Sequence, residues 1–241
     1  MIVFVHGVLG NWRTTWSNGR SYWPELLTRD KTFDGQDIYV YDYQSPKLNG
    51  SFSVDELADN LRLVLTTDGV LHYKEITFVS HSMGGLVTRA FLIRYQNQVV
   101  PKVRFLYFFG TPTTGNPYAV LAALVSKNPQ FGQMYPINQP DSYLGPLQSN
   151  WLGADLGLKS YCAYETVPLL LGQKVVERDS ATNLCNKRLD PINADHLNMV
   201  KPIDSNSTPY RALKAAFEET ANLHRTSTSA RVSESSIVSR K

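Results

Sequence analysis

A serine between two small residues is the first feature of the sequence that could do chemistry. Ser82 stands in the sequence SHSMGG, after an apolar segment at 75–79 that predicts a strand and before 84–96, which predicts a helix. A sharp turn between a strand and a helix lifts a serine hydroxyl above the carboxyl edge of a sheet. The turn needs small residues two before and two after the serine, and Ser80 and Gly84 meet this need, with serine replacing the usual glycine at position 80. Ser82 is therefore the candidate nucleophile.

A serine hydroxyl becomes a good nucleophile when a histidine takes its proton, and the sequence contains 5 histidines. His6 and His81 belong to motif positions, His72 lies in a polar turn, and His224 borders the C-terminal tail. His196 is the remaining candidate. It lies late in the chain, which agrees with the order nucleophile, acid, histidine, although a loop histidine can also simply bind nearby backbone.

Two carboxylates compete to orient the imidazole of His196. Glu165 follows the predicted strand 159–164, and Asp179 lies in the loop beyond it. The end of a strand holds a side chain more firmly than a loop does, so Glu165 is favoured. Asp179 could instead cap a short helix, because small residues follow it.

A tetrahedral oxyanion requires two backbone N–H groups that point to one place. Met83 follows the candidate nucleophile and supplies one of them. Val8 is expected to supply the other, since it lies just after the predicted strand 2–5 and Gly7 lets this loop pass close to the serine turn. His6 is interpreted as a structural residue that fixes the loop.

Predicted strands and helices alternate along the chain, which is typical of a parallel sheet with helices on both faces. The clearest helix is 54–67, where Ser53 and Glu56 have the spacing of a capping box and apolar residues follow at helical spacing. We therefore predict the α/β class. The predicted strands are 2–5, 37–43, 75–79, 103–109 and 159–164, and the predicted helices are 23–28, 54–67, 84–96 and 209–220.

The length of 241 residues predicts a single domain, which we place at 1–224. Many Gly, Pro, Asn and Gln residues between short apolar stretches at 113–158 predict one or two helices that form a small lid. Within it, 118–125 is apolar nearly all round, which favours a buried helix over a surface that faces a membrane. The Ser- and Thr-rich end predicts a disordered tail at 225–241.

Charge and motifs exclude several classes of protein. The net charge is +3, and four basic residues and one acid fall in the tail, so 1–224 is neutral and has no basic face for nucleic acid. The histidines lack paired metal-ligand spacing, and no phosphate loop or dinucleotide fingerprint is present. We expect no metal, no cofactor and no nucleic-acid partner.

The cysteines and the apolar segments bear on location. Cys162 and Cys185 are too few for a disulfide framework; they could form one bond, but the reduced state is favoured. No apolar run approaches the roughly 18 residues of a spanning helix. The apolar start ends at His6, so it does not have the form of a signal peptide, and an intracellular location is favoured. The chain begins inside a predicted core strand, which is consistent with trimming from a longer precursor.

The sequence resembles lipase-type α/β hydrolases and, among them, the serine-active-site-containing protein group, which is related to the GPI inositol-deacylase-like hydrolases. Two early strands of the larger superfamily have no counterpart before Met1, so the resemblance implies a reduced α/β-hydrolase fold of about six mostly parallel strands with helices on both faces. The segments that carry the resemblance are 3–10, 15–16, 23–24, 80–86, 164–166, 175–176, 179–181 and 195–202.

The resemblance also bears on the site. It implies Ser82 as nucleophile and His196 as base. It has an acidic residue at the positions of both Glu165 and Asp179, so it leaves the acid open. Gln173 stands where many lipases have their aspartate.

We therefore expect a serine hydrolase that cleaves a carboxylic ester through an acyl-enzyme intermediate. A lipid ester is the expected substrate, with peripheral membrane contact, because apolar residues near the turn suit an acyl chain. The alternatives are acyl transfer to an alcohol on the same residues and a non-catalytic binding module, which would not need a nucleophile, a base and an acid together. The residues expected to line the acyl pocket are Leu9, Trp12, Trp16 and Leu86, with the segment 113–158.

Overall fold

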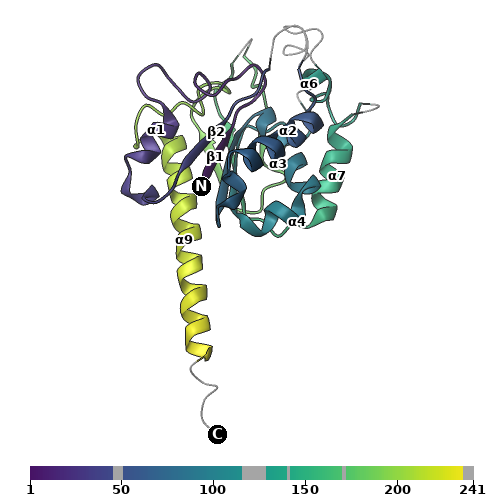
Figure 1. Ribbon diagram of the computed structural model, residues 1–241. Coiled ribbons are helices and arrows are strands. Elements are labelled where there is room, and N and C mark those ends of the chain that lie inside the picture. The colour runs from purple at the N-terminus through teal and green to yellow at the C-terminus, as the bar shows by residue number, and fades with distance from the viewer. Residues whose placement is uncertain (46–50, 116–128, 140–141, 170–171, 236–241) are drawn as a thin grey trace.

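A computed structural model of the chain describes residues 1–45, 51–115, 129–139, 142–169 and 172–235. Within these residues one 6-stranded sheet has the order β2-β1-β3-β4-β5-β6, and every neighbouring pair is parallel (Figure 1). The predicted α/β class and parallel sheet are confirmed. The strands are β1 Ile2–Val5, β2 Ile38–Tyr41, β3 Ile76–His81, β4 Val103–Phe109, β5 Ser160–Glu165 and β6 Leu189–Ile192.

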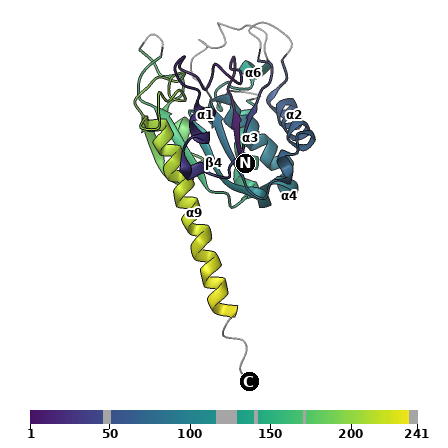
Figure 2. The same cartoon turned by 60° about the vertical axis from the view of Figure 1, so that its left-hand side comes forward.

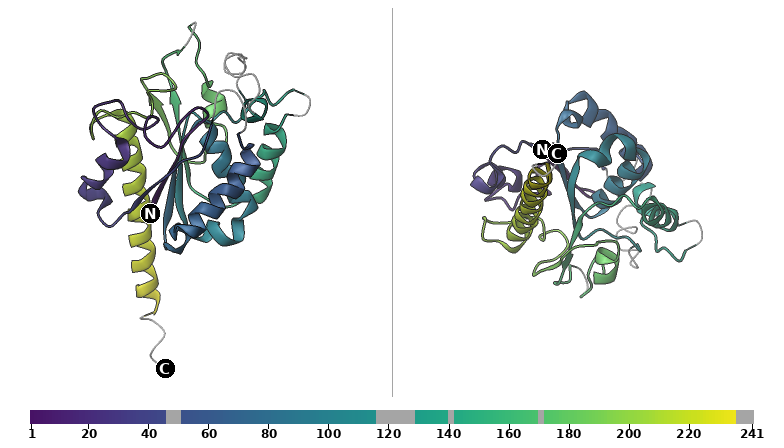
Figure 3. Two further views of the ribbon diagram at one scale, coloured as in Figure 1. Left: turned by 45° about the horizontal axis from the view of Figure 1, so that its top comes forward. Right: turned by 90° about the horizontal axis from the view of Figure 1, so that it is seen from below.

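Helices cover both faces of the sheet (Figure 3). One face packs against α2, α3 and α7, and the other against α1 and the first turns of α9. The α-helices are α1 Trp23–Thr28, α2 Val54–Thr67, α3 Met83–Arg94, α4 Gln96–Val99, α6 Pro129–Gly132, α7 Leu144–Ala154, α8 Arg178–Thr182 and α9 Thr208–Ser235, and the 3-10 turns are η1 Lys31–Phe33, η2 Val70–His72 and η3 Val100–Lys102.

The order of the strands places the site. The chain runs from β1 outward to β2, then returns to β3 on the other side of β1 and continues to β6. Ligands of open α/β sheets bind beyond the carboxyl ends of the strands where the direction of winding reverses. Here that point lies between β1 and β3, so the loop after β1 and the turn after β3 meet at the same edge.

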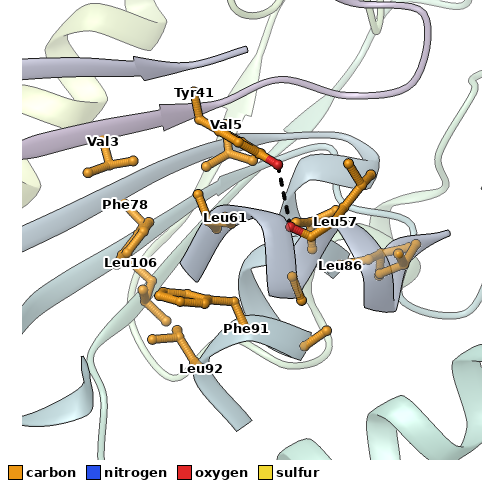
Figure 4. Packing of buried hydrophobic residues seen from close by; sticks show 14 of the residues in the cluster. Val3, Val5, Tyr41, Leu57, Leu61, Phe78, Leu86, Phe91, Leu92 and Leu106 are labelled. Atoms are coloured by element: carbon orange, nitrogen blue, oxygen red, sulfur yellow. Dashed lines mark hydrogen bonds between the residues drawn. The ribbon is translucent and has the colours of Figure 1, made fainter. Parts of the chain in front are cut away.

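Alternate residues of the central strands fill two separate apolar layers. Val3 and Val5 face α2 and α3, whereas Ile2 and Phe4 face α1 and α9. All four residues of β1 are fully buried, as a strand covered on both faces requires. Figure 4 shows the first layer, which also includes Leu57 and Leu61 of α2, Phe78 and Leu106 of the sheet, and Phe91 and Leu92 of α3.

The described parts of the predicted lid have different places in the fold. Helix α7 belongs to the layer beside α3: Leu144 and Leu147 are buried there, and the guanidinium of Arg89 on α3 lies 5.4 Å from the ring centroid of Trp151. Helix α6 lies at the carboxyl edge of the sheet (Figure 1). Residues 116–128, and with them the apolar segment 118–125, are outside the described residues.

The prediction of a disordered tail is wrong for 225–235. Helix α9 continues from Thr208 to Ser235 and extends away from the sheet, as Figure 2 shows. No glycine or proline follows Pro209, and alanine, leucine and arginine favour helix, so a helix that starts on the core can continue past it.

The favoured reduced state of the cysteines is also wrong. Cys162 of β5 and Cys185, which follows α8, form a disulfide, and their Cα atoms are 6.0 Å apart. The chain between β5 and β6 folds back beside β5, which the sequence alone does not reveal. Disulfides are rare in reducing compartments, so this bond counts against the favoured intracellular location. Among the residues described, no helix combines the length and the apolar character needed to cross a bilayer.

Candidate active site

The turn between β3 and α3 holds Ser82 in a strained conformation. Its φ is 53° and its ψ is −130°, outside the regions that non-glycine residues normally adopt. Such strain costs on the order of 1–3 kcal/mol and persists only where neighbouring structure imposes it. The N–H of Ser82 donates to the carbonyl of Phe109 at 2.8 Å, which fixes the turn to β4. The turn therefore has the geometry predicted from its small residues.

Small residues let the loop after β1 reach this turn. A Cβ at Gly84 would collide with the carbonyl oxygens of Val5 and His6, and a Cβ at Gly7 would lie 2.7 Å from the Cβ of Ser82. Real Cβ atoms do not come this close to other heavy atoms. The two glycines are therefore required by the contact between the two loops.

Ser80 stands where a glycine is usual, and its buried side-chain hydroxyl has a hydrogen-bond partner. The hydroxyl of Thr88 donates to the carbonyl of Gly84 at 2.9 Å, so the hydroxyl of Ser80 donates to that of Thr88 at 2.8 Å. Ser80 is fully buried. The serine thus ties β3 to the first turn of α3.

Three predicted site residues come together at the carboxyl edge of the sheet. His196 Nε2 lies 2.9 Å from Ser82 Oγ, and His196 Nδ1 lies 2.5 Å from Glu165 Oε2. They come from the turn after β3, the end of β5 and the loop after β6, and each is at most 5% exposed. The carboxylate, the imidazole and the hydroxyl form one continuous line of hydrogen bonds.

Glu165, and not Asp179, contacts His196. Glu165 Oε1 accepts hydrogen bonds from the N–H groups of Val175 and Val176 at 2.5 and 3.0 Å, which leaves Oε2 for the imidazole. Asp179 is exposed in the first turn of α8, where a negative charge suits the helix dipole. The end of β5 therefore positions the carboxylate of Glu165 beside the imidazole.

His6 fixes the loop after β1. Its Nδ1–H donates to the carbonyl of Gly7 at 2.8 Å, and its Nε2 accepts from the N–H of Tyr43 at 3.3 Å. The ring stacks on that of Tyr43 with centroids 3.9 Å apart. Burial lowers the pKa of His6, which favours the neutral imidazole that these contacts require.

Two backbone N–H groups remain available beside Ser82. Met83 is the first residue of α3, and Val8 lines the pocket with Ser82; within the described ranges neither N–H donates a hydrogen bond. The next residue, Leu9, has a φ of 59°, and its N–H donates to Ser45 Oγ at 2.8 Å. These are the two groups predicted for an oxyanion: Val8 lines the pocket, and Met83 directly follows Ser82 at the start of α3.

Ser45 and Gln130 support this loop and were missed from sequence. The hydroxyl of Ser45 donates to Oε1 of the fully buried Gln130 at 2.7 Å, and Nε2 of Gln130 donates to the carbonyl of Phe52 at 2.8 Å. These contacts join α6 to the loop after β1. No sequence spacing signals them, since they join positions 36 and 85 residues apart along the chain.

A pocket of about 350 Å³ opens at Ser82. Of the residues expected to line it, Leu9 does so. Trp16 and Leu86 do not, because both belong to the buried core, and Trp12 lies outside the pocket with 44% of its surface exposed. The other lining residues are Gly7, Val8, Gly10, Thr14, Thr15, His81, Ser82, Leu169, Val175, His196, Leu197 and Lys201.

His81 holds the loop that carries His196. Its Nε2 lies 2.9 Å from the carbonyl oxygen of His196, to which it donates a hydrogen bond. Burial, followed by the charge of His196, holds the pKa of His81 well below its usual range. The neutral ring can therefore fix the backbone of His196 without adding a charge to the site.

The parallel sheet and the helices on both of its faces form an α/β-hydrolase fold. The model of the family described as "Putative serine esterase (DUF676)" matches residues 1–119, a span that includes Ser82 but neither Glu165 nor His196. Comparison with curated protein sequences gave no match. The family match supports an ester hydrolase.

Solved lipase and esterase structures share the fold. The mature lipase BlEst2 of Bacillus licheniformis matches 83% of this chain and 86% of its own, with a TM-score of 0.54 and 20% identity. A thermophilic esterase of Thermogutta terrifontis matches 91% and 89%, with a TM-score of 0.54 and 15% identity. Phospholipase PlaB of Legionella pneumophila matches 68% of this chain with a TM-score of 0.54 and 18% identity, but the chain spans only 37% of that protein.

No group of three or more His, Cys, Asp or Glu side chains suited to a metal ion occurs in the part of the chain that the structure describes.

The lowered pKa values of His6 and His81 predict a loss of stability in mild acid. Both start from the ordinary value of 6.5, which the unfolded chain retains. Below that pH the unfolded state binds more protons than the native state, so the free energy of unfolding decreases as the pH falls. Urea unfolding at pH 7.5 and 5.5 measures this change.

The matched variants are His81→Gln, whose amide can still donate to the carbonyl of His196, and His72→Gln, which alters an exposed histidine. We expect a smaller pH-dependent loss in the first variant and the wild-type loss in the second. An undiminished loss in His81→Gln would contradict the neutral state of His81.

Proposed function

We propose that the protein is a serine hydrolase that cleaves a carboxylic ester through an acyl-enzyme intermediate. The observation that carries this proposal is the unbroken line of hydrogen bonds from Glu165 through His196 to Ser82, at the base of an apolar pocket. Nucleophilic serines are activated by this arrangement, and the strained turn presents the hydroxyl to a substrate.

The first half of the reaction forms the acyl-enzyme. His196 Nε2 takes the proton of Ser82 as its Oγ bonds to the ester carbon. Glu165 holds Nδ1–H and stabilises the imidazolium. The N–H groups of Val8 and Met83 bind the carbonyl oxygen as it becomes an oxyanion, each contributing about 3 kcal/mol to lowering the barrier. The C–O bond to the alcohol then breaks, and His196 returns the proton to the leaving alcohol.

Water completes the cycle by the same steps. His196 removes a proton from the water as its oxygen bonds to the acyl carbon, and the same N–H groups bind the second oxyanion. The bond to Ser82 Oγ then breaks, His196 protonates that oxygen, and the free carboxylic acid leaves.

Lipid esters are the substrate class that the pocket favours. Its volume of about 350 Å³ and its mostly apolar lining suit an acyl chain. Exposed apolar side chains lie on loops at the same edge of the sheet, which supports peripheral contact with a membrane: Trp12 is 44%, Val167 38% and Leu197 50% exposed. The printed names of the similar structures include lipases and a phospholipase.

Labelling with a fluorophosphonate probe tests the nucleophile. We expect the wild-type protein to react and Ser82→Ala not to react, because the probe bonds to an activated serine oxygen. Hydrolysis of a p-nitrophenyl ester, with the free acid identified as product, is measured in parallel. Equal labelling of both proteins, or of neither, would contradict the proposal, and a new ester formed with an added alcohol would indicate acyl transfer instead.

Paired amide variants test the acid. Glu165→Gln removes the charge that fixes the imidazole, and we expect turnover to fall by about three to four orders of magnitude with the fold intact. Asp179→Asn alters an exposed carboxylate and is expected to change turnover little. Circular dichroism and thermal unfolding verify that both variants are folded. The opposite ranking of the two turnover numbers would assign the acid to Asp179.

A further inference from the structure

Lys201 places a positive charge at the pocket that contains Ser82 and His196. Among the residues that the structure describes, no aspartate or glutamate lines this pocket, and His81, its other imidazole, is held neutral by burial. Across the described portion of the chain, the ammonium of Lys201 makes no hydrogen bond and no ion pair. The pocket is therefore mostly apolar, with the hydroxyls of Thr14 and Thr15 and the candidate catalytic groups as its polar atoms, and among its described lining residues only Lys201 carries a permanent charge.

The backbone of Lys201 is fixed in place. The amide of Asn18 donates to the carbonyls of Lys201 and Pro202 at 3.3 and 2.9 Å, and the hydroxyl of Ser21 donates to that of Pro202 at 2.5 Å. At the other end of the segment, His81 holds the carbonyl of His196. The segment 196–201 is thus held at both ends, which keeps the base of the lysine side chain at a constant position relative to His196.

Nearby carboxylates are occupied elsewhere. Asp195 accepts hydrogen bonds from the N–H groups of Leu197 and Asn198 and from the side-chain amide of Asn198, at 2.7 to 2.9 Å. The carboxylate of Asp42 accepts from the N–H of Trp12. Neither carboxylate neutralises Lys201. Its charge contributes, after burial and the other two histidines, to lowering the pKa of His81.

We propose that Lys201 is a specificity-determining residue that binds an anionic group of the substrate, so that the preferred substrates are esters that carry a carboxylate or a phosphate near the ester bond. This inference rests on the proposed function and deepens it. A charged partner in a mostly apolar pocket forms a stronger hydrogen bond than a neutral one, and among the described lining residues no carboxylate is present to pair with the ammonium. A neutral ester would leave the cation unpaired.

Two matched pairs of esters test this inference. In the first, p-nitrophenyl butyrate is compared with the p-nitrophenyl hemiester of succinic acid, which carries a carboxylate on the acyl side. In the second, 1-octanoylglycerol is compared with its 3-phosphate, which carries the charge on the alcohol side. The ratio of kcat/KM for the charged ester to that for the neutral ester is measured for wild type, Lys201→Met, Lys201→Arg and the control Lys74→Met, which alters an exposed lysine before β3.

We expect Lys201→Met to lower this ratio about tenfold in at least one pair, as loss of a charged hydrogen bond would. Lys201→Arg should retain most of the ratio, and Lys74→Met all of it. An effect in the first pair alone indicates a carboxylate on the acyl side, and one in the second pair alone a phosphate on the alcohol side. An unchanged ratio in both pairs would overturn the inference.

A binding measurement separates this inference from the proposed function. Calorimetry with Ser82→Ala compares 1-octanoylglycerol 3-phosphate with 1-octanoylglycerol, and succinate with butyrate, and needs no turnover. Tighter binding of a charged member, lost in the Ser82→Ala/Lys201→Met double variant, supports the role of Lys201 even if no ester is cleaved. Equal binding of both members in both pairs contradicts that role even if neutral esters are hydrolysed.

Discussion

The site depends on a close approach of two backbones, between the loop after β1 and the first turn of α3. Gly84 and Gly7 make it possible, because a Cβ at either position would collide with the facing loop. The approach brings Val8 to the pocket that Ser82 lines, beside the turn in which Met83 follows the serine. The close approach of the two loops requires the observed strand order, in which β1 and β3 are neighbours.

The parallel sheet brings the remaining site residues to the same edge. Glu165 ends β5, and His196 follows β6. Ser82 and His196 lie 114 positions apart in the sequence, yet their side chains form a hydrogen bond at this edge. Further hydrogen bonds hold Glu165 and His196 in place. The N–H groups of Val175 and Val176 donate to one oxygen of Glu165, and His81 donates to the carbonyl of His196.

The sequence predicted those features that depend on residues close together in the chain. The capping box at Ser53 and the small residues around Ser82 act within a few residues, and the structure has both as predicted. Strand β6 was missed because its sequence, LDPI, is short, half polar and contains a proline, which only an edge strand tolerates. The pairing of Cys162 with Cys185, the support of Leu9 by Ser45, and the exposure of Lys201 to the pocket depend on how distant segments fold together. No local pattern reports them.

We infer that Ser82 and the N–H groups of Val8 and Met83 converge on one reacting carbonyl. A crystal structure of the protein inactivated by diethyl p-nitrophenyl phosphate tests it most directly. We expect a phosphorus bonded to Ser82 Oγ, with one phosphoryl oxygen about 2.7–3.1 Å from both backbone nitrogens. Phosphorus on another residue, or an adduct on Ser82 whose oxygens contact neither N–H, would contradict it.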